Sequence, residues 1–365
     1  MTYSEFCSAI GSDRTYPDAE VLYNTANESG ELEKPVRTDL IPRYFPKIKD
    51  ELISVAKEFE KDSLAVRYMN FLRVAYFKLK DSEIPFLQPE EGNLMKNFGA
   101  VFSVLEHTVS TEKEIEKRGI DEVVAEKVRT AFERALLAYK KVFGFYAVKE
   151  NIYFWDRHYL IPDLFPIDTL EFEVTKMPDE GTYFKNKSTG EITVLSNVTE
   201  NETSYHANTV KDGGVDGETV ELSKEKYECC LAPGDPVISV HIPGGTKLDS
   251  ESCNNTYKKA LEFIKKAYPE KKFKGMYVRS WLMNPTLSEI LGENSNILSF
   301  QSFYKRFPIK SMGDEVFGFV FPKPIERYED IPETTSLYRG LKKRYLDENR
   351  PVYVYAGIHL FAEDK

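Results

Sequence analysis

Apolar residues recur at three- and four-residue spacing through most of the first 150 residues. This spacing predicts amphipathic helices over residues 49–59, 64–79, 93–108 and 121–145. In the first of them, Leu52, Ala56 and Phe59 fall on one stripe. Because the connections between these segments are short, neighbouring helices are expected to run antiparallel. Residues 1–150 are therefore predicted to form a helical bundle.

The pattern changes after residue 150. Residues 170–175 alternate apolar and acidic positions, which predicts a half-buried strand, and residues 182–196 predict a hairpin that turns at 187–190. The polar, Gly- and Asp-rich stretch 197–217 is expected to be a mobile or lid-like loop, followed by a strand over 217–223. The change of pattern predicts two domains, 1–150 and 151–365.

The clearest local pattern is a strand, a glycine turn and a helix over residues 235–267. A β-branched apolar run lies between Pro236 and Pro243, and a stripe of apolar residues with flanking lysines predicts a helix that ends near Ala267. Gly244 and Gly245 lie between the two elements. Backbone N–H groups at a glycine turn and a helix N-terminus point at one place, so this stretch is a candidate anion cradle.

The remaining residues alternate between helix and strand patterns. Strands are predicted over 275–283, 316–321 and 351–361, and helices over 286–291, 296–304 and 336–347. The second half is thus predicted to be a mixed-sheet domain, and the chain as a whole is assigned to the α+β class.

Charge and hydropathy narrow the range of partners. A net charge of −10 and a pI near 5.3 argue against a general nucleic-acid or anionic-membrane surface. No apolar run approaches the roughly 20 residues that cross a bilayer, and the first residues lack a signal-peptide pattern, so a cytoplasmic location is expected. The four cysteines show no metal-ligand spacing, and no metal site is predicted.

Three motifs carry a resemblance to a known family: VHIPGG at 240–245, RSWLMNP at 279–285 and SNILSFQ at 295–301. Together with the order of predicted elements, they resemble the bacterial acyltransferase-domain proteins that pair a helical N-terminal domain with a GNAT-like C-terminal domain. The resemblance implies an N-acyltransferase that moves an acyl group from acyl-CoA, or from a carrier-protein thioester, directly to an amine or hydroxyl of an unidentified acceptor.

Acyl transfer needs a base for the acceptor, an acid for the departing thiolate and a donor to polarise the thioester carbonyl. His241, at the end of the predicted strand, is the candidate base, and Glu173, with Glu171 on the same strand face, is a candidate water-mediated base. Tyr304 resembles in position the tyrosine acid of many GNAT enzymes. A splayed pair of strands, 236–242 and 275–283, could expose a backbone N–H toward the carbonyl.

The donor side is assigned to residues on the two motif strands and the turn. Gly244, Gly245 and Thr246 are candidates for cradling phosphates through their N–H groups, while Ser280 and Trp281 are candidates for binding the donor, with Trp281 walling an acyl tunnel. The turn PGGTKLD departs from the Q/R-x-x-G-x-G/A pattern of GNAT enzymes because the leading Arg or Gln is missing.

Plainer interpretations stand beside each of these assignments. His241 can be a hydrogen-bonded structural histidine, Tyr304 a packing residue, and Gly244–Gly245 an ordinary turn. A non-catalytic binding or regulatory protein with a degenerate GNAT-like domain is therefore the alternative function. A hydrolase using Ser280 or Cys253 is disfavoured because neither lies in a G-x-S-x-G elbow.

Overall fold

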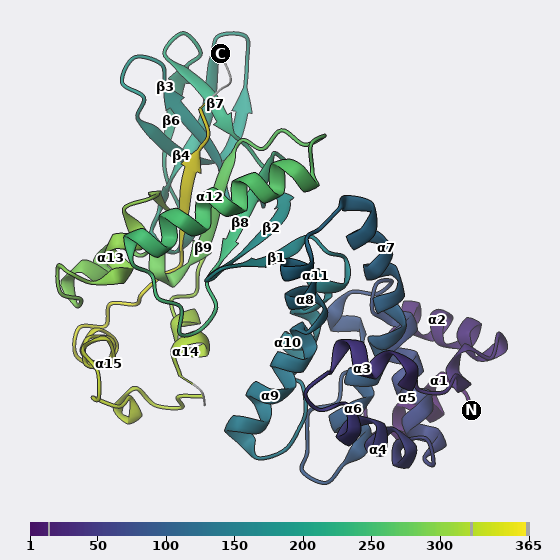
Figure 1. The fold of residues 1–365 in the computed structure, drawn as a ribbon. Coiled ribbons are helices and arrows are strands. Elements are labelled where there is room, and N and C mark those ends of the chain that lie inside the picture. Colours follow the sequence, from purple (N-terminus) through teal and green to yellow (C-terminus); the bar gives the residue numbers. More distant parts are fainter. Residues whose placement is uncertain (14, 322–323, 363–365) are drawn as a thin grey trace. The chain divides into compact units, whose positions relative to one another are not determined.

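The computed structural model describes residues 1–13, 15–321 and 324–362 (Figure 1). The chain divides into two compact units, Met1–Phe165 and Pro166–Lys365. This division follows compactness of packing, and the domain boundary drawn at residue 150 stays a prediction.

The first unit is built from helices, as predicted. The helices are α1 (Tyr3–Ala9), α2 (Pro17–Glu28), α3 (Ile41–Tyr44), α4 (Lys49–Phe59), α5 (Ser63–Ala75), α6 (Leu94–Ser103), α7 (Thr108–Arg118), α8 (Glu122–Arg129), α9 (Ala131–Phe143), α10 (Glu150–Trp155) and α11 (Arg157–Leu160). The single helix predicted over 121–145 is interrupted at Thr130, whose φ of −91° and ψ of 14° leave the helical region. Phe6, Tyr23 and Phe71 pack ring against ring in the core of the unit.

The second unit contains a six-stranded sheet, whose first strand begins two residues before the boundary, and a helix that crosses one face of the sheet. The strands are β1 (Leu164–Ile167), β2 (Leu170–Lys176), β8 (Pro236–His241), β9 (Gly275–Ser280), β10 (Lys305–Pro308) and β11 (Tyr355–Leu360), in the spatial order β1-β2-β8-β9-β11-β10. Strands β8 and β9 run parallel, and α12 (Ser250–Ala267) provides the crossover that a parallel pair requires (Figure 1). The predicted strand–turn–helix is therefore confirmed.

A second sheet of five strands is inserted between β2 and β8. Its strands are β3 (Thr182–Asn186), β4 (Ile192–Glu200), β5 (Ser204–Lys211), β6 (Val215–Ser223) and β7 (Tyr227–Leu231), in the order β6-β5-β4-β3-β7. The backbone N–H of Met177 donates to the carbonyl of Asp235 at 2.7 Å, and Gly234 N–H donates to the carbonyl of Met177 at 2.8 Å. The insertion thus begins and ends at one place on the six-stranded sheet.

The loop predicted over 197–217 was wrong, because most of these residues belong to β4, β5 and β6. Their polar side chains bond to one another across the strands: Ser196 Oγ and Asn197 Nδ2 both donate to the carboxylate of Asp216, at 2.6 and 2.7 Å. These cross-strand bonds take the place of the apolar alternation by which strands are recognised in a sequence.

The strand predicted over 316–321 was also wrong, because Glu315–Val320 forms helix α14. Phe317 and Phe321, four residues apart, stack with ring centroids 5.9 Å apart, and Phe317 packs on Tyr345. The other helices of the unit are α13 (Asn296–Gln301) and α15 (Ser336–Lys342), and one π-helical turn (Lys343–Asp347) follows α15.

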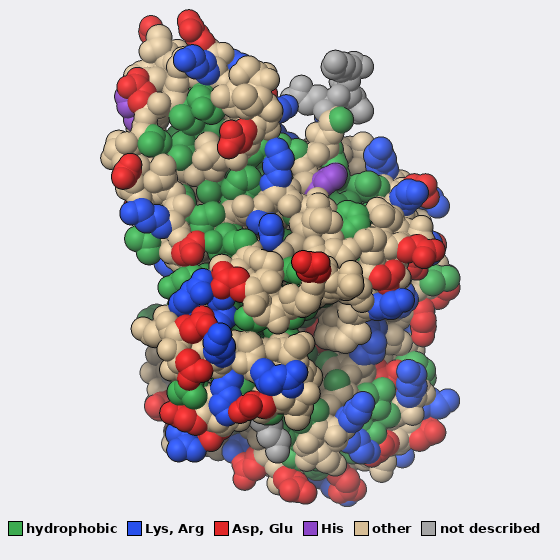
Figure 2. All heavy atoms as spheres, turned by 90° about the vertical axis from the view of Figure 1, so that its left-hand side faces the viewer, with side chains coloured by type: hydrophobic (Ala, Val, Ile, Leu, Met, Phe, Trp, Pro, Cys, Tyr) green, Lys and Arg blue, Asp and Glu red, His purple; other side chains and the backbone are tan. Residues whose placement is uncertain are grey.

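The inserted sheet has a small apolar core of its own. Phe184, Leu195 and Ala207 are buried, and partly buried apolar residues pack against them: Val198, Tyr205, Val220, Leu222 and Tyr227. Hydrophobic side chains gather among charged ones in the upper part of the face in Figure 2, at the height that the inserted sheet has in Figure 1.

No helix of residues 1–13, 15–321 and 324–362 combines the length and hydrophobicity that a membrane crossing needs.

The turn between β5 and β6 packs directly against the backbone that follows β10. Gly214 has a φ of +72°, and a Cβ at this position would lie 2.3 Å from the backbone nitrogen of Lys310. The Ser311 N–H also donates to the Gly213 carbonyl at 3.3 Å. Glycine is therefore required at Gly214 both by its φ and by the close approach of a second backbone.

Replacing Gly214 with alanine is expected to destabilise the second unit. The added methyl group must displace the backbone at Lys310 in a strained φ region, at a cost of about 2 kcal/mol or more. Scanning calorimetry should show a fall in Tm of roughly 4 to 8 °C. Gly292→Ala is the matched control, since a Cβ there meets no atom within 4 Å. Equal Tm values for the two variants would contradict the packing argument.

Candidate active site

Backbone pairing between β8 and β9 covers only part of their length. The register joins Ile238 with Met276 and Ser239 with Tyr277. The last two residues of β8 and the last three of β9 lie beyond this ladder. The two strands therefore part at their carboxyl ends, where ligands of open α/β sheets commonly bind.

The unpaired ends, Val240–His241 and Val278–Ser280, are called the seam below. Each side of the seam is still paired with its outer neighbour: Val240 lies opposite Phe172 on β2, and Val278 lies opposite Gly357 on β11. The opening is thus confined to the carboxyl ends of β8 and β9, between outer strands that stay paired. The splayed strands expected from the sequence are present in the structure.

Two buried amides fix the chain where it leaves β9. Asn284 Nδ2 donates to the carbonyl of Tyr353 at 2.9 Å, and Asn284 Oδ1 accepts from the N–H of Thr286 at 2.9 Å. Gln301 Nε2 donates to the carbonyls of Leu282 and Asn284, at 2.7 and 3.0 Å. The RSWLMNP and SNILSFQ motifs therefore hold one another, and their amides anchor the exit from the seam.

His241 and Glu173 lie together on one face of the sheet. His241 lies opposite Glu171 and Glu173 opposite Ser239, so all four side chains share the face that Phe172 and Val240 do not occupy. His241 Nε2 is 2.8 Å from Glu173 Oε2, and both side chains are largely shielded from solvent. An ionised carboxylate only accepts, so Nε2 is the donor in this contact, and Nδ1 is the ring nitrogen that can take a proton from another group.

Tyr304 lies on the opposite face, buried against α12. Its hydroxyl is 2.6 Å from the hydroxyl of Tyr257, on α12. Burial raises the pKa of Tyr304 well above its usual value, so the phenol is protonated at neutral pH. A protonated phenol at this position can act as an acid and cannot act as a base.

Sequence patterns alone did not single out Tyr257, Glu180, Tyr277 or Arg279 as site residues. Glu180 Oε1 accepts from Arg279 Nε at 2.7 Å, and its other oxygen accepts from the Tyr277 hydroxyl. Since Tyr277 lies in register with Ser239, these groups share the face of His241. Glu180 and Tyr277 are 97 residues apart, and no local pattern links them.

The glycine turn has fewer backbone N–H groups available to bind a phosphate than the sequence predicts. Thr246 N–H donates to the carbonyl of Pro243 at 3.2 Å, and Thr246 Oγ1 donates to the same carbonyl at 2.6 Å. Gly244 and Gly245 have open space where a Cβ would lie. The two glycines remain candidates for cradling phosphates, while the N–H of Thr246 is used within the turn.

The N-terminus of α12 already has an anion. Asp249 Oδ1 accepts from the N–H of Ser252 at 3.0 Å as the helix cap. Hydrogen bonds from Ser252 lower the pKa of Asp249 to about 2, so the carboxylate is charged at neutral pH. Lys247 Nζ, 3.4 Å from the carboxylate, is the nearby cation that could accompany a phosphate.

Ser280 and Trp281 lie at the end of β9. Ser280 Oγ accepts from the N–H of Leu282 at 3.1 Å, which caps the 3-10 turn Trp281–Met283, and Trp281 is buried. The predicted strand 275–283 therefore ends at Ser280. The structure gives Ser280 a capping role, and whether either residue binds a donor stays a prediction.

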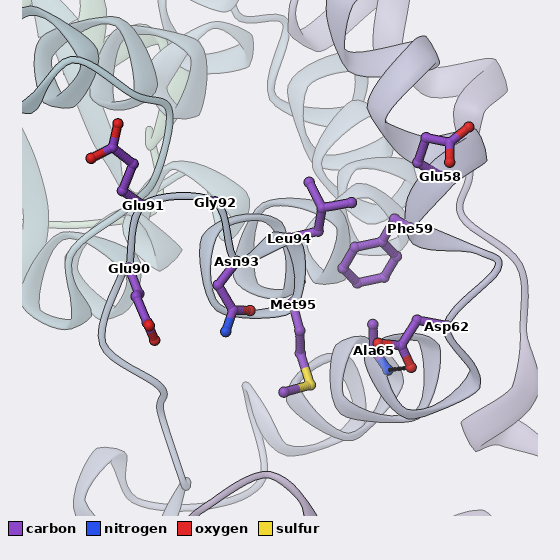
Figure 3. A pocket seen from close by; sticks show the side chains of 10 residues that line it. All are labelled: Glu58, Phe59, Asp62, Ala65, Glu90, Glu91, Gly92, Asn93, Leu94 and Met95. Atoms are coloured by element: carbon purple, nitrogen blue, oxygen red, sulfur yellow. Dashed lines mark hydrogen bonds between the residues drawn. The ribbon is translucent and has the colours of Figure 1, made fainter.

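A hollow of about 550 Å³ lies elsewhere, in the helical unit (Figure 3). It is lined by the end of α4, the start of α5 and residues 90–95, with Glu58, Asp62, Glu90 and Glu91 among them. Three of these carboxylates have local structural partners: Glu58 pairs with Lys61 at 2.7 Å, Glu90 pairs with Lys96, and Asp62 caps α5. The hollow contains none of the candidate residues named in the sequence analysis.

The second unit matches a known family, and the whole chain resembles solved structures. The family model described as "GNAT-like C-terminal domain" matches residues 164–359. An acyltransferase in complex with CoA and 10C-teicoplanin superposes with a TM-score of 0.68, and one in complex with decanoyl-CoA and teicoplanin with 0.67. An acyltransferase mutant in complex with octanoyl-CoA also gives 0.67.

These three structures share 18% identity with the chain, and each comparison covers 99% of this chain and 100% of the other. Likeness at that identity shows a common fold over both units. No curated protein matches the chain. Because the family model spans more than half of the 365 residues, the chain belongs to the GNAT-like C-terminal domain family.

Proposed function

We propose that this protein transfers an acyl group from acyl-CoA to an amine or hydroxyl of a small-molecule acceptor. The observation that carries the proposal is the seam, with the His241–Glu173 pair on one face of the sheet and the Tyr304 phenol on the other. A thioester lying in the seam would have a base on one side and an acid on the other, which is the arrangement that direct transfer requires.

In the proposed reaction, a backbone N–H at the seam polarises the thioester carbonyl, and Nδ1 of His241 takes the proton of the attacking group. Glu173 stabilises the imidazolium that forms. The new bond to the acyl carbon forms as the carbon–sulfur bond breaks, and Tyr304 protonates the departing thiolate. No intermediate bound to the protein is needed.

The solved structures support the donor class. Those acyltransferases were crystallised with octanoyl-CoA, decanoyl-CoA or CoA, and two of them also contain a form of teicoplanin. Acyl-CoA is accordingly proposed as the co-substrate here, with a carrier-protein thioester as the alternative donor. The acceptor is proposed only as a class, a small molecule with an amine or hydroxyl, because identity to those proteins is 18%.

One observation favours a non-catalytic binding protein. The ionised Asp249 at the N-terminus of α12 lies where a helix dipole would otherwise attract a pyrophosphate. If that charge repels CoA, the domain keeps its fold but lacks its donor. The binding experiment that follows separates the two functions.

Saturating octanoyl-CoA should raise the Tm of the protein. A ligand at one hundred times its Kd stabilises the native state by about 2.7 kcal/mol, which corresponds to a rise of roughly 5 to 10 °C. Differential scanning calorimetry with acetyl-, octanoyl- and decanoyl-CoA would measure the shift. Octanoate without CoA is the control for binding to apolar surfaces and should leave Tm unchanged. Constant Tm with every acyl-CoA would favour the binding protein.

His241→Ala should lower kcat/KM for release of CoA by about 10²- to 10⁴-fold, because the acceptor loses its base. Glu173→Gln should give a smaller loss, since the imidazole remains but its charged form is less stabilised. CoA release is measured with a thiol reagent in the presence of ethanolamine or an amino sugar. Glu228→Gln, on the inserted sheet, is the matched charge control and should keep full turnover. Undiminished turnover in His241→Ala would refute the base assignment.

A further inference from the structure

We infer that Tyr257 is a positioning residue for acyl transfer: its hydroxyl orients the Tyr304 phenol toward the seam and stabilises the phenolate left when Tyr304 has protonated the thiolate. This inference rests on the proposed function. No pattern in the sequence marks Tyr257 as a functional residue.

The strand register places the two phenols on either side of the seam. The ring of Tyr257 packs against Phe172, with centroids 6.2 Å apart, and Phe172 lies opposite Val240, the first residue of β8 beyond the ladder. Tyr257 therefore approaches the seam from the β8 side. Phe172 and Val240 point toward α12, so Tyr257 contacts the sheet on the face that α12 covers.

Tyr304 approaches from the β9 side of the same face. A Cβ on Gly357 would lie 3.1 Å from the Cβ of Tyr304, and Gly357 lies opposite Val278, the first residue of β9 beyond the ladder. The 2.6 Å contact between the hydroxyls of Tyr257 and Tyr304 thus spans the seam at the level where the two strands part. The absence of a side chain at Gly357 gives Tyr304 room to lie there.

The surroundings of the pair are aromatic and buried. Tyr257 is 9% exposed and Tyr304 is 7% exposed, and Phe303 and Phe300 pack edge-on or tilted against their rings. Burial raises the pKa of Tyr257 as well as that of Tyr304. A phenolate formed in this environment is poorly solvated, so a hydrogen bond from the neighbouring hydroxyl is worth more than it would be in water.

The proton balance assigns a separate task to each phenol. As the carbon–sulfur bond breaks, the electron pair goes to sulfur, and the Tyr304 proton moves to that sulfur to give the CoA thiol. Tyr304 is left as a phenolate, which accepts a hydrogen bond from the Tyr257 O–H. The proton taken from the acceptor by His241 leaves to solvent, and solvent returns one to Tyr304, so the reaction is acyl-CoA plus amine giving amide plus CoA.

Tyr257→Phe tests the inference with two donors that differ only in the leaving group. With octanoyl-CoA, the loss of a hydrogen bond to a developing phenolate should lower kcat/KM by about 10- to 100-fold. With S-(4-nitrophenyl) thiooctanoate, whose arenethiolate departs without a proton, the variant should keep nearly the wild-type rate. Ethanolamine or an amino sugar serves as acceptor, and uncatalysed aminolysis is subtracted.

The rates with the two donors are measured on one preparation and compared as a ratio. A smaller folded fraction lowers both rates equally and therefore leaves the ratio unchanged. Tyr345→Phe is the matched control: this buried phenol of the second unit accepts from the N–H of Val352 at 2.9 Å, and its loss should lower both rates equally or neither. In a Tyr304→Phe background, Tyr257→Phe should cause no further loss with octanoyl-CoA.

Equal losses with both donors would overturn the inference, because they indicate a structural role, and so would unchanged rates with both. An additive loss in the Tyr304→Phe background would also overturn it. If the wild-type protein released no CoA from any acyl-CoA with any acceptor, the proposed function itself would fail and the inference with it. That result is distinct from an active wild type with an unaffected variant.

Discussion

The second unit depends on one interruption in its hydrogen bonding. Backbone pairing continues on the outer sides of β8 and β9 but stops between them after Ser239 and Tyr277. An interrupted ladder normally leaves polar groups unsatisfied, so it persists only where the rest of the structure holds the strands apart. Here the buried amides of Asn284 and Gln301 hold the exit of β9, and α12 covers the face below.

Much of this arrangement could be predicted because it is local. Over 235–267, β-branched residues, two adjacent glycines and a stripe of apolar positions predict a strand, a turn and a helix. The strand β8 and the helix α12 lie where they were expected. The helical first unit was predicted for the same reason. In the inserted sheet, the hairpin over 182–196 and the strand over 217–223 were predicted, but β5 and the adjoining ends of β4 and β6 were not. There Ser196, Asn197 and Asp216 stabilise the sheet with hydrogen bonds rather than with apolar side chains.

The partnership of the candidate residues could not be predicted, because strand register creates it. His241 and Glu173 were separate candidates 68 residues apart, and the antiparallel pairing of β2 with β8 brings them within 2.8 Å. The contact of Tyr257 with Tyr304 likewise depends on how α12 lies across the sheet. The chain contains 22 tyrosines, and Tyr257 lies in a predicted helix whose apolar stripe is ordinary, so nothing in the sequence distinguishes it.

The inserted sheet leaves and rejoins the six-stranded sheet at Met177 and Asp235, which are joined by a backbone hydrogen bond of 2.7 Å. Everything between these two residues could therefore be lengthened, shortened or exchanged without altering the pairing of β2 with β8. Glu180 lies in this inserted segment and bonds to Tyr277 and Arg279, which lie on the same face of the sheet as His241. Under the proposed reaction, evolution can thus remodel the surroundings of the incoming nucleophile in one segment, while the residues proposed to act on the departing sulfur, in α12 and Tyr304, are inherited unchanged.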